Sequence, residues 1–187
     1  MLDAMLRWDE TARAWLAGYH TPVLDAVMVG LSRAGEGGML WLALGIVIVL
    51  ARRRMAAGVL QMALAIAVTS LLADAVVKPV VGRLRPSETL ADVRVLEPRH
   101  ASRSFPSGHA ANAFAAAYAL ARLVPTAQMA IWLLAVAVSF SRIYVGVHYP
   151  LDVGAGALIG LACSVFVVGG SRWYSVDSAA RTPPVPR

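Results

Sequence analysis

Long runs of mostly apolar residues are the feature of this sequence that most restricts its fold. Residues 55–81 form the longest run, and residues 153–170 form another near the end of the chain. A bilayer core is about 30 Å thick, so a helix needs roughly 20 apolar residues to cross it. Backbone polar groups in lipid must be hydrogen-bonded within the protein. These runs therefore predict a helical membrane protein.

The composition agrees with this interpretation. Of the 187 residues, 58% are hydrophobic and 15% are charged, whereas soluble domains are about 45–50% apolar and about 25% charged. The net charge of +6 does not require nucleic acid, because the basic residues cluster at the ends of apolar runs, as membrane orientation demands. We therefore expect the lipid bilayer as the surroundings and no nucleic-acid partner.

The apolar segments predict an all-α polytopic bundle of about six transmembrane helices. Besides the two runs above, these segments are residues 22–31, 39–51, 110–123 and 127–140. The first is short and carries Asp25, so it either crosses the membrane or only dips into it. We divide the chain into an N-terminal helix (1–20), a membrane-embedded domain (21–171) and a disordered cytoplasmic tail (172–187), whose proline-rich polar sequence cannot form a core.

Residues 1–20 predict an amphipathic helix. Apolar residues recur there at roughly helical spacing, with charged residues between them. Such a helix either lies at the membrane surface, which we prefer, or packs as an ordinary cytosolic helix on the bundle. The stretch does not have the basic start and apolar centre of a signal peptide.

The arginines predict the orientation in the membrane. If six helices alternate, Arg52–Arg54, Arg122 and the tail arginines share one side, which the positive-inside rule assigns to the cytoplasm. Residues 82–106 and the turn at His148 then share the outer face. That outer segment also carries arginines, against the rule: Arg83, Arg85, Arg94, Arg99 and Arg103. We interpret this excess as a need to bind an anion there.

Three polar stretches lie on the predicted outer face. They are KPVVGRLRP (78–86), PSGH (106–109) and SRIYVGVHYPLD (141–152). Ionisable residues at membrane depth are costly and usually functional. Each stretch alone has a simpler interpretation, as a turn with a helix cap, a satisfied polar contact or an interfacial anchor. Their occurrence together on one face favours a shared site.

The PSGH stretch predicts a helix start that binds phosphate. Pro106 suits the first position of a helix, where its missing N–H is not needed. Ser107, Gly108 and His109 then offer unpaired first-turn N–H groups to an anion, and a glycine lets the ligand approach the backbone. Cations on the same face match phosphate oxygens; they are Lys78, Arg85 and Arg142. So much positive charge favours a phosphate or diphosphate over a carboxylate.

His148 and Asp152 predict an oriented nucleophile. We expect the helix to begin near Pro150, because a proline disfavours helical geometry at the residue before it. Asp152 then lies in the first turn and can hydrogen-bond one imidazole nitrogen of His148, which raises the basicity of the other nitrogen. His109 is a second imidazole, suited to general acid catalysis near neutral pH.

The three stretches together resemble the signature of the type 2 phosphatidic acid phosphatase family, integral-membrane lipid phosphatases related to vanadium haloperoxidases. That signature is Lys, six residues and Arg-Pro; then Pro-Ser-Gly-His; then Ser-Arg, five residues, His, three residues and Asp. Every fixed position is matched, over about 75 residues of the chain. The matching residues are Lys78, Arg85, Pro86, Pro106, Ser107, Gly108, His109, Ser141, Arg142, His148 and Asp152.

The resemblance implies a role for each site residue. His148 would attack phosphorus and form a phosphohistidine, Asp152 would orient it, and His109 would protonate the leaving oxygen and then activate water. The residues implied to hold the phosphoryl oxygens are Lys78, Arg85, Ser107, Gly108 and Arg142. The family needs no metal, and we expect no cofactor.

The size of the chain and the stretch SRIYVGVHYPLD resemble the undecaprenyl-diphosphate phosphatases of the family. We therefore expect removal of the terminal phosphate of a membrane polyprenyl diphosphate at the outer face of a bacterial-type cytoplasmic membrane. A phosphatidylglycerophosphate or phosphatidic acid phosphatase is the alternative, because the motifs read the phosphate and not the lipid. A lipid-phosphate transporter would not require His109, His148 and Asp152 together with three cations. A non-catalytic scaffold would have a degenerate pocket, but no residue of the signature is missing.

Overall fold

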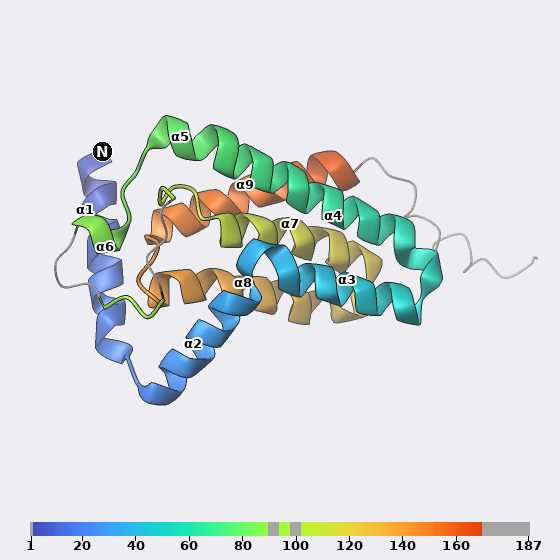
Figure 1. Cartoon of the computed structure of the whole chain (residues 1–187), viewed down its shortest axis with the longest axis horizontal. Coiled ribbons are helices and arrows are strands. Elements are labelled where there is room, and N and C mark those ends of the chain that lie inside the picture. The colour runs from blue at the N-terminus through green and yellow to red at the C-terminus, as the bar shows by residue number, and fades with distance from the viewer. Residues whose placement is uncertain (1, 90–93, 98–101, 170–187) are drawn as a thin grey trace, which may run out of the picture.

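The computed structural model of the chain describes residues 2–89, 94–97 and 102–169 (Figure 1). All regular structure in these ranges is helical, so the predicted all-α class is confirmed. The helices are α1 (Leu2–Leu16), α2 (Pro22–Ala34), α3 (Met39–Ala51), α4 (Ala56–Leu71), α5 (Lys78–Val81), α6 (Pro86–Thr89), α7 (Gly108–Leu123), α8 (Gln128–Tyr144) and α9 (Pro150–Val168). The predicted tail, residues 172–187, lies outside the described ranges.

Helix α7 forms the centre of the bundle and packs against α4, α8 and α9. Its inward faces are mostly alanine, and small residues let neighbouring helix backbones approach closely. The closest approach is at Gly160 of α9, where an added side-chain carbon would overlap the backbone carbonyl of Ala111. The sequence of small residues therefore sets the α7–α9 distance, and with it the relative position of the two stretches that begin these helices.

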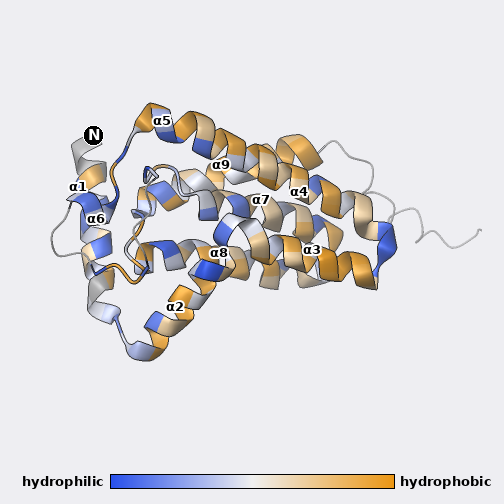
Figure 2. Cartoon of the chain, in the orientation of Figure 1, coloured by the Kyte–Doolittle hydropathy of each residue, from blue (hydrophilic) through white to orange (hydrophobic). Residues whose placement is uncertain are grey.

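The outer surfaces of the surrounding helices are apolar. Figure 2 shows hydrophobic residues along α3, α4 and α9, and large side chains such as Leu50, Leu60 and Phe166 are exposed there. A soluble protein rarely exposes apolar patches of this extent. This apolar surface is suited to a lipid bilayer, as the sequence predicts.

Three helical stretches in the described ranges are long and apolar enough to cross a membrane, namely Arg53–Thr89, Pro125–Tyr144 and Pro150–Val168. Helices α2 and α3 pass the same test only as a pair, bent by 54°. The predicted count of six spans is therefore not confirmed and stays a prediction. The membrane-surface position predicted for residues 1–20 also stays a prediction, although α1 is helical over Leu2–Leu16.

The long apolar run 55–81 is not one regular helix. A π-helical segment, Leu72–Val77, separates α4 from α5. Pro79 accounts for this break, because a proline cannot donate the regular helical hydrogen bond and its ring crowds the preceding turn. Such wider turns are frequent at functional sites, and this one carries Asp74, which lies four residues before Lys78.

The predicted polar stretches lie at one end of the bundle. Figure 1 shows α1, α6, the start of α9 and the end of α8 at that end. The arginine-rich turn between α3 and α4 lies at the opposite end, where it is the hydrophilic tip in Figure 2. The bundle thus separates the candidate site from Arg52–Arg54 by its full length.

Candidate active site

A cavity of about 190 Å³ at this end is lined by residues of all three polar stretches. The predicted site residues on its walls are Lys78, Arg85, Gly108, His109, Arg142 and His148. Asp152 and Ser107 are fully buried behind them. The tertiary structure therefore brings together, around one cavity, predicted site residues that are up to 70 positions apart in the sequence, from Lys78 to His148.

His148 lies in the turn between α8 and α9 and is only 2% exposed. Gly146 makes this turn possible, because its φ of 81° lies in the left-handed region that favours glycine. The Nδ1 atom of His148 lies 3.5 Å from Oδ2 of Asp152. On the other edge of the ring, Nε2 lies 3.3 Å from Nη1 of Arg85. One ring nitrogen thus faces the carboxylate, and the other faces a cation.

Asp152 is held by hydrogen bonds on both carboxylate oxygens. The Ser104 hydroxyl donates to Oδ2 at 2.5 Å, and the backbone N–H of Tyr149 donates to the same atom at 2.9 Å. The second bond closes the first turn of α9, which begins at Pro150 as the sequence predicts. On the other oxygen, Nη1 of Arg83 donates to Oδ1 at 2.7 Å. These contacts hold the carboxylate in one orientation toward His148.

The surroundings of His148 keep its imidazole neutral. Burial, together with the positive charges of Arg85 and Arg142, lowers the pKa of His148 to about 3. The hydrogen bond with Asp152 acts in the opposite direction but does not outweigh burial. A neutral imidazole keeps a lone pair, so His148 is available as a nucleophile across the physiological pH range.

Arg85 is fixed to the neighbouring loops. Its side chain is 4% exposed and donates to the carbonyl of Ser102 at 2.8 Å and to the carbonyl of Val147 at 2.9 Å. A further bond joins Nη2 to the Ser102 hydroxyl at 3.0 Å. Neutral oxygens thus hold this guanidinium while its positive charge still faces the cavity.

The other two cations are paired with carboxylates. Nζ of Lys78 lies 2.6 Å from Oδ1 of Asp74, one helical turn earlier. Nη1 of Arg142 donates to Oε2 of Glu97 at 2.7 Å and also to the hydroxyl of Ser32. Both carboxylates contact cations that the sequence predicts to bind phosphate, so a phosphate bound there would have to compete with them.

Helix α7 begins two residues later than the sequence suggests. The prediction that Pro106 takes the first helical position is wrong: the helix starts at Gly108, and Ser107 is its N-cap. The Ser107 side chain accepts the backbone N–H of Ala110, which is the ordinary role of a serine before a helix. The hydroxyl of Ser107 is therefore used within the helix start.

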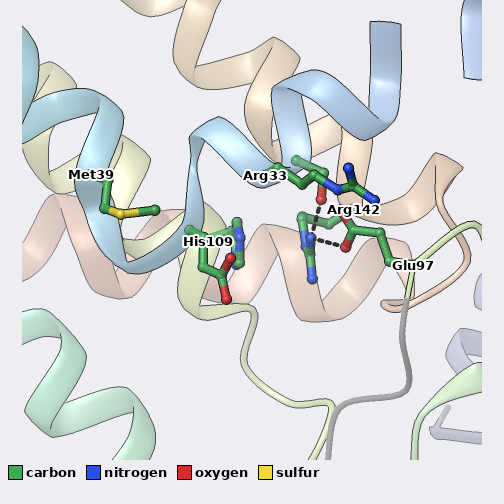
Figure 3. Close-up of a pocket in the computed structure, with 7 residues that line it drawn as sticks. Arg33, Met39, Glu97, His109 and Arg142 are labelled. Carbon is green, nitrogen blue, oxygen red and sulfur yellow. Dashed lines mark hydrogen bonds and ion pairs between the residues drawn. The ribbon is translucent and has the colours of Figure 1, made fainter. Parts of the chain in front are cut away.

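His109 borders two cavities. Besides the cavity around His148, it lines a larger one of about 510 Å³, together with Ser32, Arg33, Glu36, Met39, Glu97 and Arg142. Figure 3 shows His109 and Arg142 facing this space, with Glu97 beside the arginine. His109 therefore lies between the His148 side and a space large enough for a further part of a substrate.

Several polar contacts at the site were not predicted from the sequence. Ser104 directly precedes the PSGH stretch, and Arg83 lies within the Lys78–Arg85 spacing, so both had a local signal. Glu97 and Asp9 had none. Arg94 of the outer segment pairs with Asp25 at 3.0 Å instead of facing the cavity, and the predicted anion-binding residue Arg99 lies outside the described ranges.

Within the described ranges, no group of three or more His, Cys, Asp or Glu side chains is arranged to hold a metal ion. The titratable groups that line the cavity are three cations, two imidazoles and the carboxylates of Glu36 and Asp74. Such a set is suited to binding an anion and to moving protons.

Comparison with known proteins gives consistent similarities. Residues 58–174 match the PAP2 superfamily. An undecaprenyl-diphosphatase of Sulfolobus acidocaldarius is 35% identical over 141 residues, which cover 73% of this chain and 66% of that protein. The crystal structure of Aquifex aeolicus LpxE has a TM-score of 0.74 and 32% identity, covering 85% of this chain and 93% of that one.

A second solved structure is similar over nearly the whole chain. It is a transmembrane PAP2-type phosphatidylglycerolphosphate phosphatase from Bacillus subtilis, with a TM-score of 0.71 and 28% identity. The similarity covers 96% of this chain and 90% of that one. The likeness therefore extends beyond the three polar stretches to the arrangement of the helices.

Proposed function

This chain belongs to the PAP2 superfamily, and from that premise we propose that it removes the terminal phosphate of a polyprenyl diphosphate such as undecaprenyl diphosphate. The predicted resemblance is confirmed, and relatives named as phosphatases support its assignment to the phosphoric ester hydrolases. The polyprenyl diphosphate itself is the proposal, supported by the relative named undecaprenyl-diphosphatase. A phosphatidylglycerophosphate or phosphatidic acid phosphatase is the second candidate, favoured by the likeness to the Bacillus subtilis enzyme.

One observation carries the proposal. His148 directs Nδ1 toward the carboxylate of Asp152 and Nε2 toward a cavity lined by Lys78, Arg85 and Arg142. A binding protein for lipid phosphates would need the cations but not a neutral imidazole oriented from behind by a carboxylate. This arrangement is the one that an oriented nucleophile needs.

In the proposed first step, Nε2 of His148 attacks the terminal phosphorus as the bond to the leaving oxygen breaks. His109, protonated at the start of the step, gives its proton to that oxygen. The products are a phosphohistidine and the shortened lipid phosphate. Asp152 stabilises the positive charge that develops on the imidazole during attack, in the manner of an orienting carboxylate.

In the second step, His109 takes a proton from water as the water oxygen attacks phosphorus. The bond between phosphorus and Nε2 breaks, inorganic phosphate leaves, and His148 returns to its neutral form. Negative charge spreads over the phosphoryl oxygens in both transition states, and fixed positive groups stabilise it. The groups proposed for this are Lys78, Arg85, Arg142 and the first turn of α7, with Gly108 and Ser107.

We further propose that the site faces the outside of a cytoplasmic membrane. The support is the distance between the site and the arginine-rich turn Arg52–Arg54, because short basic loops stay in the cytoplasm. In a variant without Cys163, a membrane-impermeant thiol reagent should label a cysteine at Arg103 in intact cells. It should label one at Arg53 only after the membrane is opened; the reverse pattern would overturn the orientation.

The same labelling determines the number of crossings. Six crossings put the N-terminus in the cytoplasm, whereas a single crossing of the bent α2–α3 pair gives five and puts α1 outside. The contact between Asp9 in α1 and Leu151 at the start of α9 favours the second arrangement. A cysteine at the exposed Thr11 is labelled in intact cells only if five is correct.

The proposed activity is tested by phosphate release from purified full-length protein. The panel is undecaprenyl diphosphate, phosphatidylglycerophosphate, phosphatidic acid and lysophosphatidic acid, each with and without EDTA. We expect the highest kcat/KM for undecaprenyl diphosphate and no effect of EDTA. Preference for a glycerolipid would move the assignment to the second candidate, and a folded protein that hydrolyses none of the four would contradict the enzyme.

A further inference from the structure

Two residues outside the family signature connect the N-terminal helix to the nucleophile pair. Arg83 lies between α5 and α6 and donates to Oδ1 of Asp152 at 2.7 Å through Nη1, and to Oδ2 of Asp9 at 2.6 Å through Nη2. Asp9 belongs to α1 and is separated from Asp152 by most of the chain. A continuous chain of contacts therefore runs from α1 through Arg83 to Asp152 and His148.

Asp9 is unusual for a residue of an amphipathic helix because its side chain is fully buried. Its second oxygen, Oδ1, accepts the backbone N–H of Leu151 at 2.8 Å. This N–H is one of the groups that have no partner within the first turn of α9. Burial raises the pKa of Asp9, while the Leu151 N–H and Arg83 act against that rise. A carboxylate in such a place is costly unless it is paired.

Arg83 is held in one orientation by three groups. The guanidinium divides its two terminal nitrogens between the two carboxylates, and its Cζ atom lies 4.0 Å from the centre of the Tyr149 ring. A planar guanidinium can make this divided contact, whereas the compact ammonium of a lysine cannot make it in the same geometry. The side chain is 18% exposed, so water only partly screens these contacts.

The contact with Arg83 fixes the orientation of the Asp152 carboxylate. Arg83 occupies Oδ1, so Oδ2 is the oxygen that faces Ser104 and His148. The charges matter as well. Arg83 alone would cancel the charge of Asp152, but Asp9 leaves the three-residue group with one net negative charge. That negative charge lies behind His148, where it stabilises the positive charge that develops on the imidazole during attack.

We propose that Arg83 and Asp9 are positioning residues for the His148–Asp152 pair, so that the N-terminal helix takes part in catalysis. Arg83 determines which oxygen of Asp152 faces the imidazole. Asp9 fixes the orientation of Arg83 and gives the three-residue group its net negative charge. This inference rests on the proposed phosphohistidine chemistry, because it concerns the charge on His148 during attack.

The test compares kcat and KM of full-length variants on the best substrate of the panel. We expect Arg83→Met to lower kcat by roughly ten- to hundredfold, the loss typical when a residue that orients a functional side chain is removed. We expect it to change KM by less than about twofold. Arg83→Lys should recover part of the loss because it restores the charge. Asp9→Asn, which keeps an oxygen for Leu151, should lower kcat by about three- to tenfold.

Coupling distinguishes this network from two separate structural contacts. If Asp9 acts through Arg83, the double variant should be no slower than Arg83→Met alone, because contacting residues in one network are not additive. Arg94→Met is the matched control, since Arg94 pairs with Asp25 away from the cavity. It should leave kcat within about twofold of the wild type.

Three results would overturn the inference. They are a kcat for Arg83→Met equal to that of Arg94→Met, a loss confined to KM, or fully additive effects of Asp9→Asn and Arg83→Met. Thermal unfolding in detergent shows whether each variant is folded, and Arg83→Lys and Asp9→Asn keep the test valid if Arg83→Met does not fold. A wild-type protein inactive on the whole panel would instead contradict the proposed function, which separates the two failures.

Discussion

The molecule contains two histidine–aspartate pairs that are built from similar groups. Nδ1 of His20 lies 2.8 Å from Oδ1 of Asp25, and Nδ1 of His148 lies 3.5 Å from Oδ2 of Asp152. Each carboxylate also pairs with an arginine and accepts a hydroxyl. Arg94 and Tyr144 donate hydrogen bonds to Asp25, whereas Arg83 and Ser104 donate hydrogen bonds to Asp152.

The two pairs differ in what the outer edge of the imidazole meets. The ring of His20 packs against Tyr144, with ring centres 4.5 Å apart. The ring of His148 instead borders a cavity with Arg85 and Arg142. The pair with the shorter contact is thus the one that does not border the cavity. A histidine–aspartate contact is therefore no evidence of chemistry by itself; the cavity and its charges make the difference.

The largest expected effect is at the two histidines. His148→Gln should reduce phosphate release by at least about a thousandfold, because it removes the nucleophile. His20→Gln is the matched change in the other pair and should stay within about twofold. Initial rates on undecaprenyl diphosphate measure both, and comparable losses in the two variants would remove the distinction between the pairs.

The next effect is at the aspartates. Asp152→Asn keeps the shape of the side chain but loses the charge that orients His148, and we expect kcat to fall by roughly 10²- to 10⁴-fold. Asp25→Asn should affect the unfolding temperature more than kcat, since Asp25 joins His20, Tyr144 and Arg94. An Asp152→Asn enzyme with wild-type kcat would contradict the orienting role.

The hydroxyl donors allow a finer comparison. Hydrogen bonds to charged groups contribute about 1.5–3 kcal/mol, so Ser104→Ala should lower kcat by roughly ten- to hundredfold. Tyr144→Phe removes the equivalent donor to Asp25 and should leave kcat nearly unchanged. Steady-state kinetics with both variants checks the expectation; equal losses would mean that the two hydroxyls serve the same, structural purpose.

The burial of His148 predicts a pH dependence of stability. The pKa of His148 is lowered to about 3 in the folded protein, while an unfolded histidine has a pKa near 6.5. Between these values only the unfolded chain binds the proton, so stability is lost as the pH falls through this window. The unfolding temperature in detergent should drop by a few degrees from pH 7.5 to 5. His148→Gln should show a weaker dependence; an unchanged slope would contradict the assignment.

The smallest expected effect concerns Lys78, one of the cations around the cavity that His148 borders and His20 does not. Asp74 pairs with Lys78 but is largely exposed, and exposed pairs contribute little. Removing its charge in Asp74→Asn should lower KM by about twofold, because phosphate no longer competes with a carboxylate for Lys78. Glu88→Gln is a suitable control, since Glu88 contacts the backbone of Arg85 rather than Lys78. A rise in KM for Asp74→Asn would show that the pair holds Lys78 in place instead.

Most of the helices could be predicted from apolar length alone. The segment 39–51 was predicted with the bounds of α3, and α9 begins at Pro150 as expected. Local chemistry changed the other boundaries. Ser107 caps α7 and leaves Pro106 outside, and Pro79 is preceded by a π-helical segment in the run 55–81. Boundaries depend on single hydrogen bonds, which a hydropathy pattern does not contain.

The sequence by itself determined the class of the protein, and its three polar stretches predict the residues that bind and attack a phosphate. Apolar length depends only on composition along the chain, and the spacing of the three polar stretches is local. Only the tertiary structure showed that His20 and Asp25 form a second pair away from the cavity, and that Asp9, Arg83 and Glu97 contact site residues. Those contacts join helices that are distant in sequence, so they depend on how small residues such as Gly160 let the helices pack.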